Sequence, residues 1–162
     1  MGNLAETLKH RGKSYSLRDL PKEFKPTWVE KKIIEARLTG TSFGQMSDDE
    51  IRVCVDKMIL NCSAIVGCGL PQTDYFADIL TDAVKTYLVD YGYEILTNTE
   101  VMLAMNLNEK RGIRLVSGLE LESVAFSGNH FNVSYLAKVI QNYLVIRGQL
   151  DRKLQNHIDG FE

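Results

Sequence analysis

A helix-capping signal occurs three times in this chain, and it constrains the fold more than any other feature of the sequence. Each time, a Ser or Thr is followed three residues later by Glu. The pairs are Thr27 with Glu30, Ser47 with Glu50, and Thr97 with Glu100. In such a capping box, each side chain accepts a hydrogen bond from the backbone N–H of the other residue, at the point where a helix begins. The three boxes therefore predict three helix starts.

Apolar side chains recur at three- and four-residue steps in five segments, as they do along one face of an α-helix. The segments are residues 28–38, 48–66, 74–90, 98–110 and 133–157. Thr73 and Asn132 precede the third and fifth segments as N-caps, and Gly40 follows the first as its stop. Gly148 lies inside the last segment, where we expect the helix to bend or to end early. In the first segment, Arg37 is assigned to the solvated side together with Lys31 and Lys32.

The segments outside these helices give weaker signals. Residues 113–131 alternate weakly around Ser117-Gly118, which indicates a loop or a small β-hairpin at 113–125. Residues 1–26 hold a short helical pattern at 4–9 and then Gly12, Pro21 and Pro26, so we interpret them as a semi-ordered basic arm. We predict a mainly all-α protein, with a compact bundle of about five helices in a single domain at 27–162.

The composition is that of an ordinary globular protein, with 44% hydrophobic and 25% charged residues. No stretch reaches the roughly 18 apolar residues of a membrane span, and the first residues lack the apolar core of a secretory signal. We therefore expect a cytoplasmic protein without a membrane contact. The number of cysteines is odd and they form no CxxC pair, so they are interpreted as small buried side chains in a reducing compartment. They are Cys54, Cys62 and Cys68.

No arrangement typical of catalysis is present. There is no phosphate-binding loop, and Gly67-Cys68-Gly69 ends a helical pattern where a dinucleotide-binding motif would open one. The histidines, His10, His130 and His157, are too far apart in sequence to form a metal-ligand pair. We predict no catalytic residue, no metal, no cofactor and no enzymatic activity.

Three carboxylates recur at four-residue steps along the third predicted helix. Asp74, Asp78 and Asp82 share one helix face, which we interpret as a site for a basic protein partner or as a solvated acidic face. A divalent metal held with the help of another helix, in a small enzyme, is the remaining interpretation.

Positive charge is concentrated at the other end of the sequence. Residues 1–40 hold nine Lys/Arg and five Asp/Glu, whereas residues 41–162 hold ten and sixteen. Lysines and arginines beside aromatic side chains are typical of single-stranded DNA binding. The candidate contacts are Lys9, Arg11, Lys13, Arg18, Lys22, Lys25, Trp28, Lys31 and Lys32. The alternative is an arm whose aromatic residues, including Tyr15 and Phe24, dock on the body. A smaller basic group lies near the chain end, at Arg147, Arg152, Lys153 and His157.

Four phrases of the sequence together carry a resemblance to a known family. They are residues 46–51 (MSDDEI), 64–71 (AIVGCGLP), 96–108 (LTNTEVMLAMNLN) and 131–136 (FNVSYL), the last followed by Val139, Ile140 and Tyr143. Over residues 43–150 the chain resembles a family of small, largely uncharacterised helical proteins from phages and integrated elements of gut bacteria. The resemblance implies a helical fold and offers no catalytic residues. Residues 113–130 replace the usual tight link after the fourth helix.

These observations lead to two expectations about function. The first is a non-enzymatic accessory protein of phage or mobile-element DNA replication, similar to a helicase loader. It would contact DNA through the basic arm and a protein partner, such as a replicative helicase, through the acidic helix. The alternative is a phage structural or host-interaction protein that binds only protein, and in which the acidic body and the last helix form a complex or a self-association.

Overall fold

Five α-helices account for most of the chain that the structure describes. The computed structural model describes residues 7–10, 13–16, 24–109, 124–126 and 128–158, with side chains from 24 to 156 outside the gaps. The helices are α1 (Trp28–Thr39), α2 (Asp48–Val66), α3 (Asp74–Lys85), α4 (Asn98–Glu109) and α6 (Val133–Ile158). A 3₁₀ turn, Phe43–Gln45, precedes α2, and a π-helical turn, Thr86–Asp90, extends α3. The predicted helical bundle is confirmed.

The helices begin where their capping residues predict. All three capping boxes form, and in the buried box at α4 the backbone N–H of Glu100 donates to Thr97 Oγ1 at 3.0 Å while Thr97 N–H donates to the Glu100 carboxylate at 3.3 Å. Thr73 caps α3 at 3.1 Å and Asn132 caps α6 at 2.8 Å. Each cap satisfies an N–H group that a helix start leaves without a helical partner.

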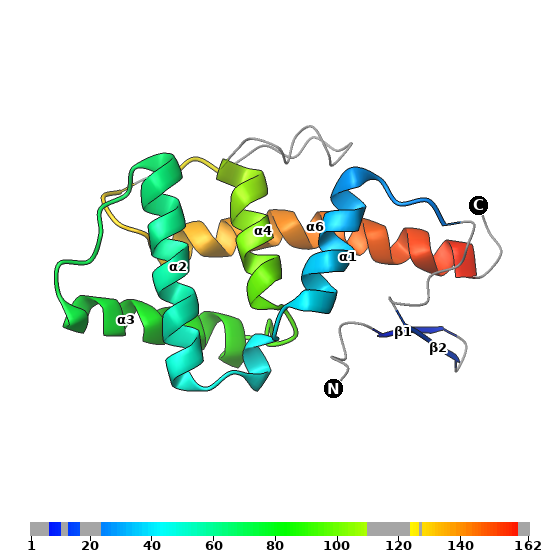
Figure 1. The fold of residues 1–162 in the computed structure, drawn as a ribbon, viewed down its shortest axis with the longest axis horizontal. Helices are drawn as coiled ribbons and strands as arrows, with labels where there is room; N and C mark the ends of the chain where they lie inside the picture. The colour runs from blue at the N-terminus through cyan, green and yellow to red at the C-terminus, as the bar shows by residue number, and fades with distance from the viewer. Residues whose placement is uncertain (1–6, 11–12, 17–23, 110–123, 127, 159–162) are drawn as a thin grey trace.

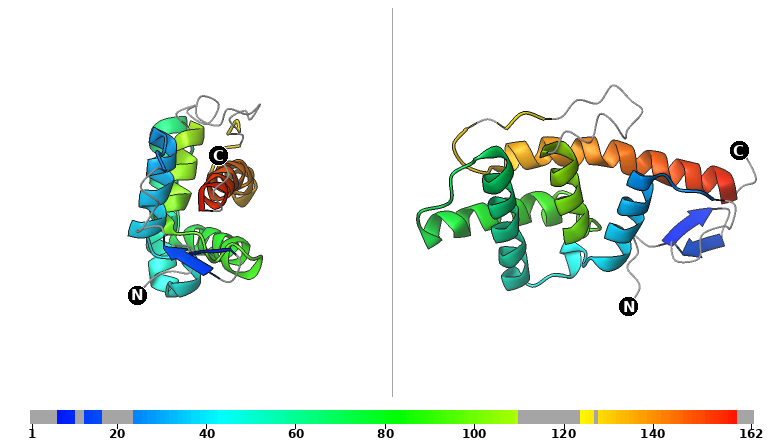
Figure 2. Two further views of the ribbon diagram at one scale, coloured as in Figure 1. Left: turned by 90° about the vertical axis from the view of Figure 1, so that its right-hand side faces the viewer. Right: turned by 45° about the horizontal axis from the view of Figure 1, so that its top comes forward.

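The helices lie in two layers (Figures 1 and 2). Helices α1, α4 and α2 stand side by side in one layer, and α6 and α3 run across them in the other. Helix α4 is central and packs against α1, α2 and α6, while α3 packs against α2 and α6. The core lies between the layers, where Met58, Met105, Leu136, Val139 and Tyr143 are almost fully buried. Helices α2 and α3 lie at one end of the molecule.

Gly40 ends α1 for a reason other than backbone freedom. Its φ of −87° is open to any residue, and its N–H donates to Ala36 O as the helix ends. A Cβ at this position would collide with the side chains of Thr97, Asn98 and Thr99 at the start of α4. Glycine is therefore required because the end of α1 and the start of α4 approach closely.

The helix predicted at 133–157 is confirmed, and the expectation that Gly148 ends it early is wrong. Helix α6 continues past Gly148 to Ile158, because the buried Ile146, Leu150 and Leu154 on either side pack into the core and outweigh the cost of one glycine, about 1 kcal/mol. At the other end of the chain, residues 7–9 belong to a strand and not to a short helix.

The N-terminal strands form a hairpin within the predicted arm. Strand β1 (Thr7–His10) pairs antiparallel with β2 (Lys13–Ser16), in a register that places Thr7 opposite Ser16 and His10 opposite Lys13. Strand β1 also contacts α6. A helix of six residues without a cap is too short to be stable, and this explains why the helical pattern at 4–9 does not prevail. The hairpin predicted at 113–125 falls almost entirely outside the described residues.

Candidate interaction surface

The three predicted carboxylates lie together on the outer side of α3. Asp74, Asp78 and Asp82 are all exposed, as their four-residue spacing predicts. Two exposed apolar side chains lie next to this row on the helix surface: Tyr75, which is 76% exposed, and Ile79, which is half exposed. We call these five residues the acidic face. The predicted acid ridge therefore also carries apolar side chains, which the sequence analysis did not assign to it.

Arg52 of α2 contributes a cation to the edge of the acidic face. Its guanidinium contacts Asp78, lies 3.2 Å from Asp56 and lies 3.9 Å from Asp74. These contacts, with the hydrogen bond to Asp56 the largest, raise the pKa of Arg52. Nearby, Lys85 pairs with Asp48 at 2.5 Å, which raises the pKa of Lys85.

Negative charge remains in excess after these ion pairs form. The surface made by α2 and α3 around the two cations carries six carboxylates against Arg52 and Lys85, for a formal charge of −4. The carboxylates are Asp48, Asp49, Asp56, Asp74, Asp78 and Asp82. Because all six are exposed, this surface presents a negative potential to an approaching molecule.

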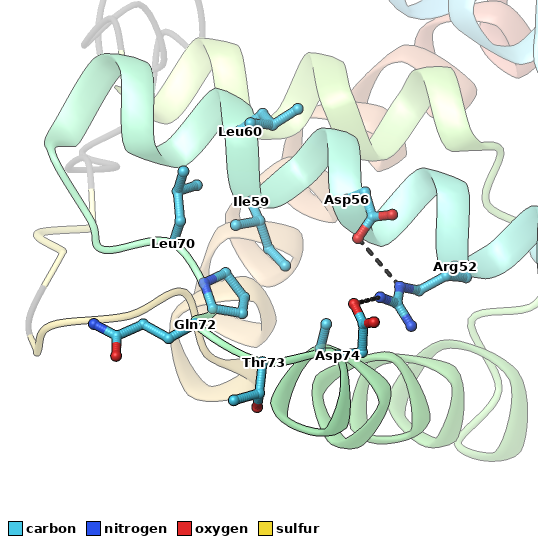
Figure 3. Close-up of a pocket in the computed structure, with 10 residues that line it drawn as sticks. Arg52, Asp56, Ile59, Leu60, Leu70, Gln72, Thr73 and Asp74 are labelled. Atoms are coloured by element: carbon cyan, nitrogen blue, oxygen red, sulfur yellow. Dashed lines mark hydrogen bonds and ion pairs between the residues drawn. The ribbon is translucent and has the colours of Figure 1, made fainter.

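A groove of about 530 Å³ runs between α2 and the start of α3 (Figure 3). Arg52, Asp56 and Asp74 line one end, and Ile59, Leu60 and Leu70 line the rest. A second hollow of about 330 Å³ lies between the same helices, and Arg52, Asp78 and Lys85 are among the residues that line it. Arg52 borders both hollows, so its ion pairs hold α2 and α3 in the arrangement that shapes them.

In the described part of the chain, no set of ligands supports a metal ion bound by Asp74, Asp78 and Asp82. Nowhere within it do three or more His, Cys, Asp or Glu side chains converge as metal ligands would. Asp74 and Asp78 point instead to the guanidinium of Arg52. The cation at this position is supplied by the protein itself.

The basic candidates lie at the opposite end of the helical layers. Lys25, Trp28, Lys31 and Lys32 are exposed at the start of α1. Trp28 is 63% exposed, and Lys32 Nζ lies 5.9 Å from the centre of its ring. Lys9 and Lys13 lie on β1 and β2, whereas Arg11, Arg18 and Lys22 lie outside the described residues.

The aromatic residues of the arm have different environments. Phe24 docks on the body, where it is buried and Lys153 Nζ lies 5.4 Å from its ring centre. Trp28 faces solvent. The docking interpretation therefore holds for Phe24 and fails for Trp28.

A buried ionic network joins α1, α4 and α6, and sequence reasoning missed it. Arg37, only 2% exposed, pairs with Asp151 at 2.7 Å, so its assignment to the solvated side is wrong. Arg147, assigned to a basic group at the chain end, is also buried and pairs with Glu100 at 2.8 Å. Tyr143 Oη donates to the same Glu100 carboxylate at 2.7 Å. The spacing of Arg37 after Ile33 and Ile34 is the signal that places it on the buried face.

This network is structural in character. Burial, reinforced by the neighbouring Glu100 carboxylate, raises the pKa of Tyr143 well above its ordinary value, so its hydroxyl remains a donor. Within the described part of the chain, the buried Arg147 Nη2 has no hydrogen-bond partner. The two ion pairs join α6 to α1 and to α4.

The cysteines are free thiols. Cys62 and Cys68 are buried and Cys54 is half buried. Burial raises the pKa of the Cys54 and Cys62 thiols above the ordinary value, which keeps both protonated at neutral pH. For Cys62 and Cys68, the prediction of small buried side chains is confirmed.

Comparisons with family models, with curated proteins and with solved structures find no match to this chain. Over the residues that the structure describes, no helix combines the length and the apolar character needed to cross a membrane.

Proposed function

We propose that this protein is a non-enzymatic adaptor that binds a partner protein through the acidic face of α3. The observation that carries the proposal is the exposure of Tyr75 and Ile79 beside Asp74, Asp78 and Asp82. Exposed large apolar side chains with charged groups next to them are typical of protein interfaces. The excess of carboxylates favours a partner whose contacting surface is basic.

The family resemblance supports a setting for this adaptor. We place it among the accessory proteins of phage or mobile-element DNA replication, in the cytoplasm of the bacterial host, with a replicative helicase as the favoured partner. The alternative is a phage structural or host-interaction protein that contacts only protein, including a second copy of itself. The two differ in whether DNA is bound.

Contact with single-stranded DNA is a second candidate function, and the exposure of Trp28 favours it. An indole in solvent beside Lys25, Lys31 and Lys32 offers a stacking surface next to cations that neutralise phosphates. Lys32 Nζ, 5.9 Å from the centre of the ring, places one of these cations next to the stacking surface.

The partner contact is tested with two matched tyrosines. Tyr75 lies on the acidic face, and Tyr91 is equally exposed, at 73%, beyond the end of α3. A partner purified from the native host and then prepared recombinantly should bind about tenfold more weakly to Tyr75→Ser in calorimetry. Tyr91→Ser should bind as the wild type does. Equal affinity for both variants would remove the acidic face from the proposal.

The DNA contact is tested by the fluorescence of Trp28, the single tryptophan of the chain. Stacking of oligothymidine on the indole should quench its emission at low salt, and added salt should restore the emission because counterions compete for the lysines. Lys31→Ala with Lys32→Ala should weaken the quenching. Emission that stays constant during the titration would favour the protein-only alternative.

A further inference from the structure

The groove between α2 and the start of α3 exposes apolar side chains that are not part of the buried core. On α2, the side chains of Ile51, Val55 and Met58 fill the core. Leu60 projects away from this core and is 57% exposed. Leu70, half exposed, lies across the groove on the loop that leads to α3 (Figure 3). Both leucines face a hollow of about 530 Å³.

The size of the hollow matches a binding site for a few side chains, because such sites are typically about 300–1,000 Å³. Its lining is mixed: Leu60, Leu70 and Pro71 supply apolar surface, and Asp56 and Asp74 are among the polar groups. Pro71 restricts the loop, so the groove needs little ordering when it is filled.

The charged end of the groove selects the type of occupant. Three carboxylates, Asp56, Asp74 and Asp78, surround the single guanidinium of Arg52, so negative charge is in excess at this end. Asp56 and Asp74 remain exposed on the groove side, with oxygens that can accept further hydrogen bonds. An ammonium or guanidinium group is the complementary ligand at this end.

We propose that this groove binds a short segment of the partner protein in which a leucine-like side chain lies next to a lysine or arginine. The apolar side chain rests between Leu60, Leu70 and Pro71, and the cation reaches Asp56 and Asp74. The inference rests on the proposed adaptor function and extends it, because it states what the partner presents. It also extends the contact surface from the outer side of α3 to its junction with α2.

Peptide display on the immobilised full-length chain tests this occupant. A library of random peptides is selected on the wild type, and enriched peptides are then measured singly against variants. Leu60→Ser with Leu70→Ser removes the apolar lining, and Asp74→Asn removes a carboxylate. Val53→Ser is the matched control, because Val53 is 53% exposed on α2 and does not line the groove. Thermal melting verifies that each variant is folded.

The proposal expects enriched peptides that share an aliphatic residue beside Lys or Arg. Their affinity should fall about tenfold in the leucine variant, should fall in Asp74→Asn, and should be unchanged in Val53→Ser. The inference is overturned by peptides without this pattern, or by equal affinity for the leucine variant and the control. Sedimentation that shows self-association abolished by the leucine variant would also overturn it, because the occupant would then be a second copy.

The same variants separate this inference from the adaptor function. If Tyr75→Ser weakens partner binding and the leucine variant does not, the groove proposal fails while the acidic face stands. If neither variant affects the partner, both proposals fail.

Discussion

Gly40 and Gly148 show how one residue type can be required in one place and costly in another. At Gly40 the start of α4 fills the space that a side chain would need. At Gly148 a Cβ would meet only Arg152 Nη1, at 3.8 Å, which is an ordinary van der Waals contact. Gly148 therefore carries the entropic cost of glycine in a helix without a packing reason for it.

Alanine at these two positions should have opposite effects. Gly40→Ala should lower the free energy of unfolding by about 2 kcal/mol, because the new Cβ forces α1 and α4 apart. Gly148→Ala should raise it by about 0.5–1 kcal/mol, because alanine is the better helix former. Urea unfolding measures both values. A stabilising Gly40→Ala would contradict the close approach of α1 to α4.

The buried pair of Glu100 and Arg147 gives a second prediction at this scale. Glu100→Gln removes the nearer anion of the buried Arg147 guanidinium and leaves only Asp151, at 3.9 Å, so it should cost about 3 kcal/mol. Combining it with Arg147→Met should recover most of this loss, since no unpaired charge then remains. The control Glu35→Gln breaks the exposed pair with Lys32 and should cost less than about 0.5 kcal/mol. Equal losses for Glu100→Gln and the control would show that Glu100 is not buried with its partner.

At the scale of elements, helix starts follow from the sequence because a capping box acts within four residues. Thr27, Ser47 and Thr97 each act on the backbone of the Glu three positions later, so no knowledge of the tertiary structure is needed. The burial of Arg37 could not be read in this way, because its partner Asp151 lies 114 positions away in the chain. Long-range pairing is decided by how α1 packs near α6.

One part of the candidate surface could be predicted from the sequence because it depends on residues within a single helix. The spacing of Asp74, Asp78 and Asp82 places them on one side of a helix, and this result depends on α3 alone. The groove depends on the distance between α2 and α3, which the loop with Leu70 and Pro71 sets. Residue spacing within one helix does not determine the distance between α2 and α3.

The contact between Glu30 of α1 and Lys153 of α6 should make stability depend on pH. Burial alone would raise the pKa of Glu30, but hydrogen bonds from Lys153 and from Thr27 outweigh it and hold the pKa below the ordinary 4.5. A carboxylate with a lowered pKa contributes stability that is present above pH 4.5 and is lost as the pH falls through the folded-state value.

Glu30→Gln should therefore be less stable than the wild type at neutral pH, by up to about 1 kcal/mol, and the difference should shrink as the pH falls below 4.5. Lys153→Met should cause a similar loss at neutral pH, because it removes the other partner. Urea unfolding at several pH values measures the difference. A difference that grows in acid would contradict the contact.

At the scale of the whole molecule, the two charged surfaces lie at opposite ends. The hairpin of β1 and β2 and the exposed start of α1 lie at one end of α6, and the acidic junction of α2 and α3 lies at the other (Figures 1 and 2). The proposed adaptor would therefore have separate surfaces for an anionic and a basic partner. The buried network joins α1, α4 and α6 between these surfaces.

Site-specific photo-crosslinking in the native host tests the central claim, that the acidic face of α3 is the partner surface. A photoreactive phenylalanine replaces Tyr75 in one variant and Tyr91 in the other, and mass spectrometry maps the crosslinked peptides. The account predicts a single predominant product at position 75, joined to a segment of the partner rich in Lys or Arg, and none of it at position 91. The same product at both positions, or none at position 75, would contradict the account.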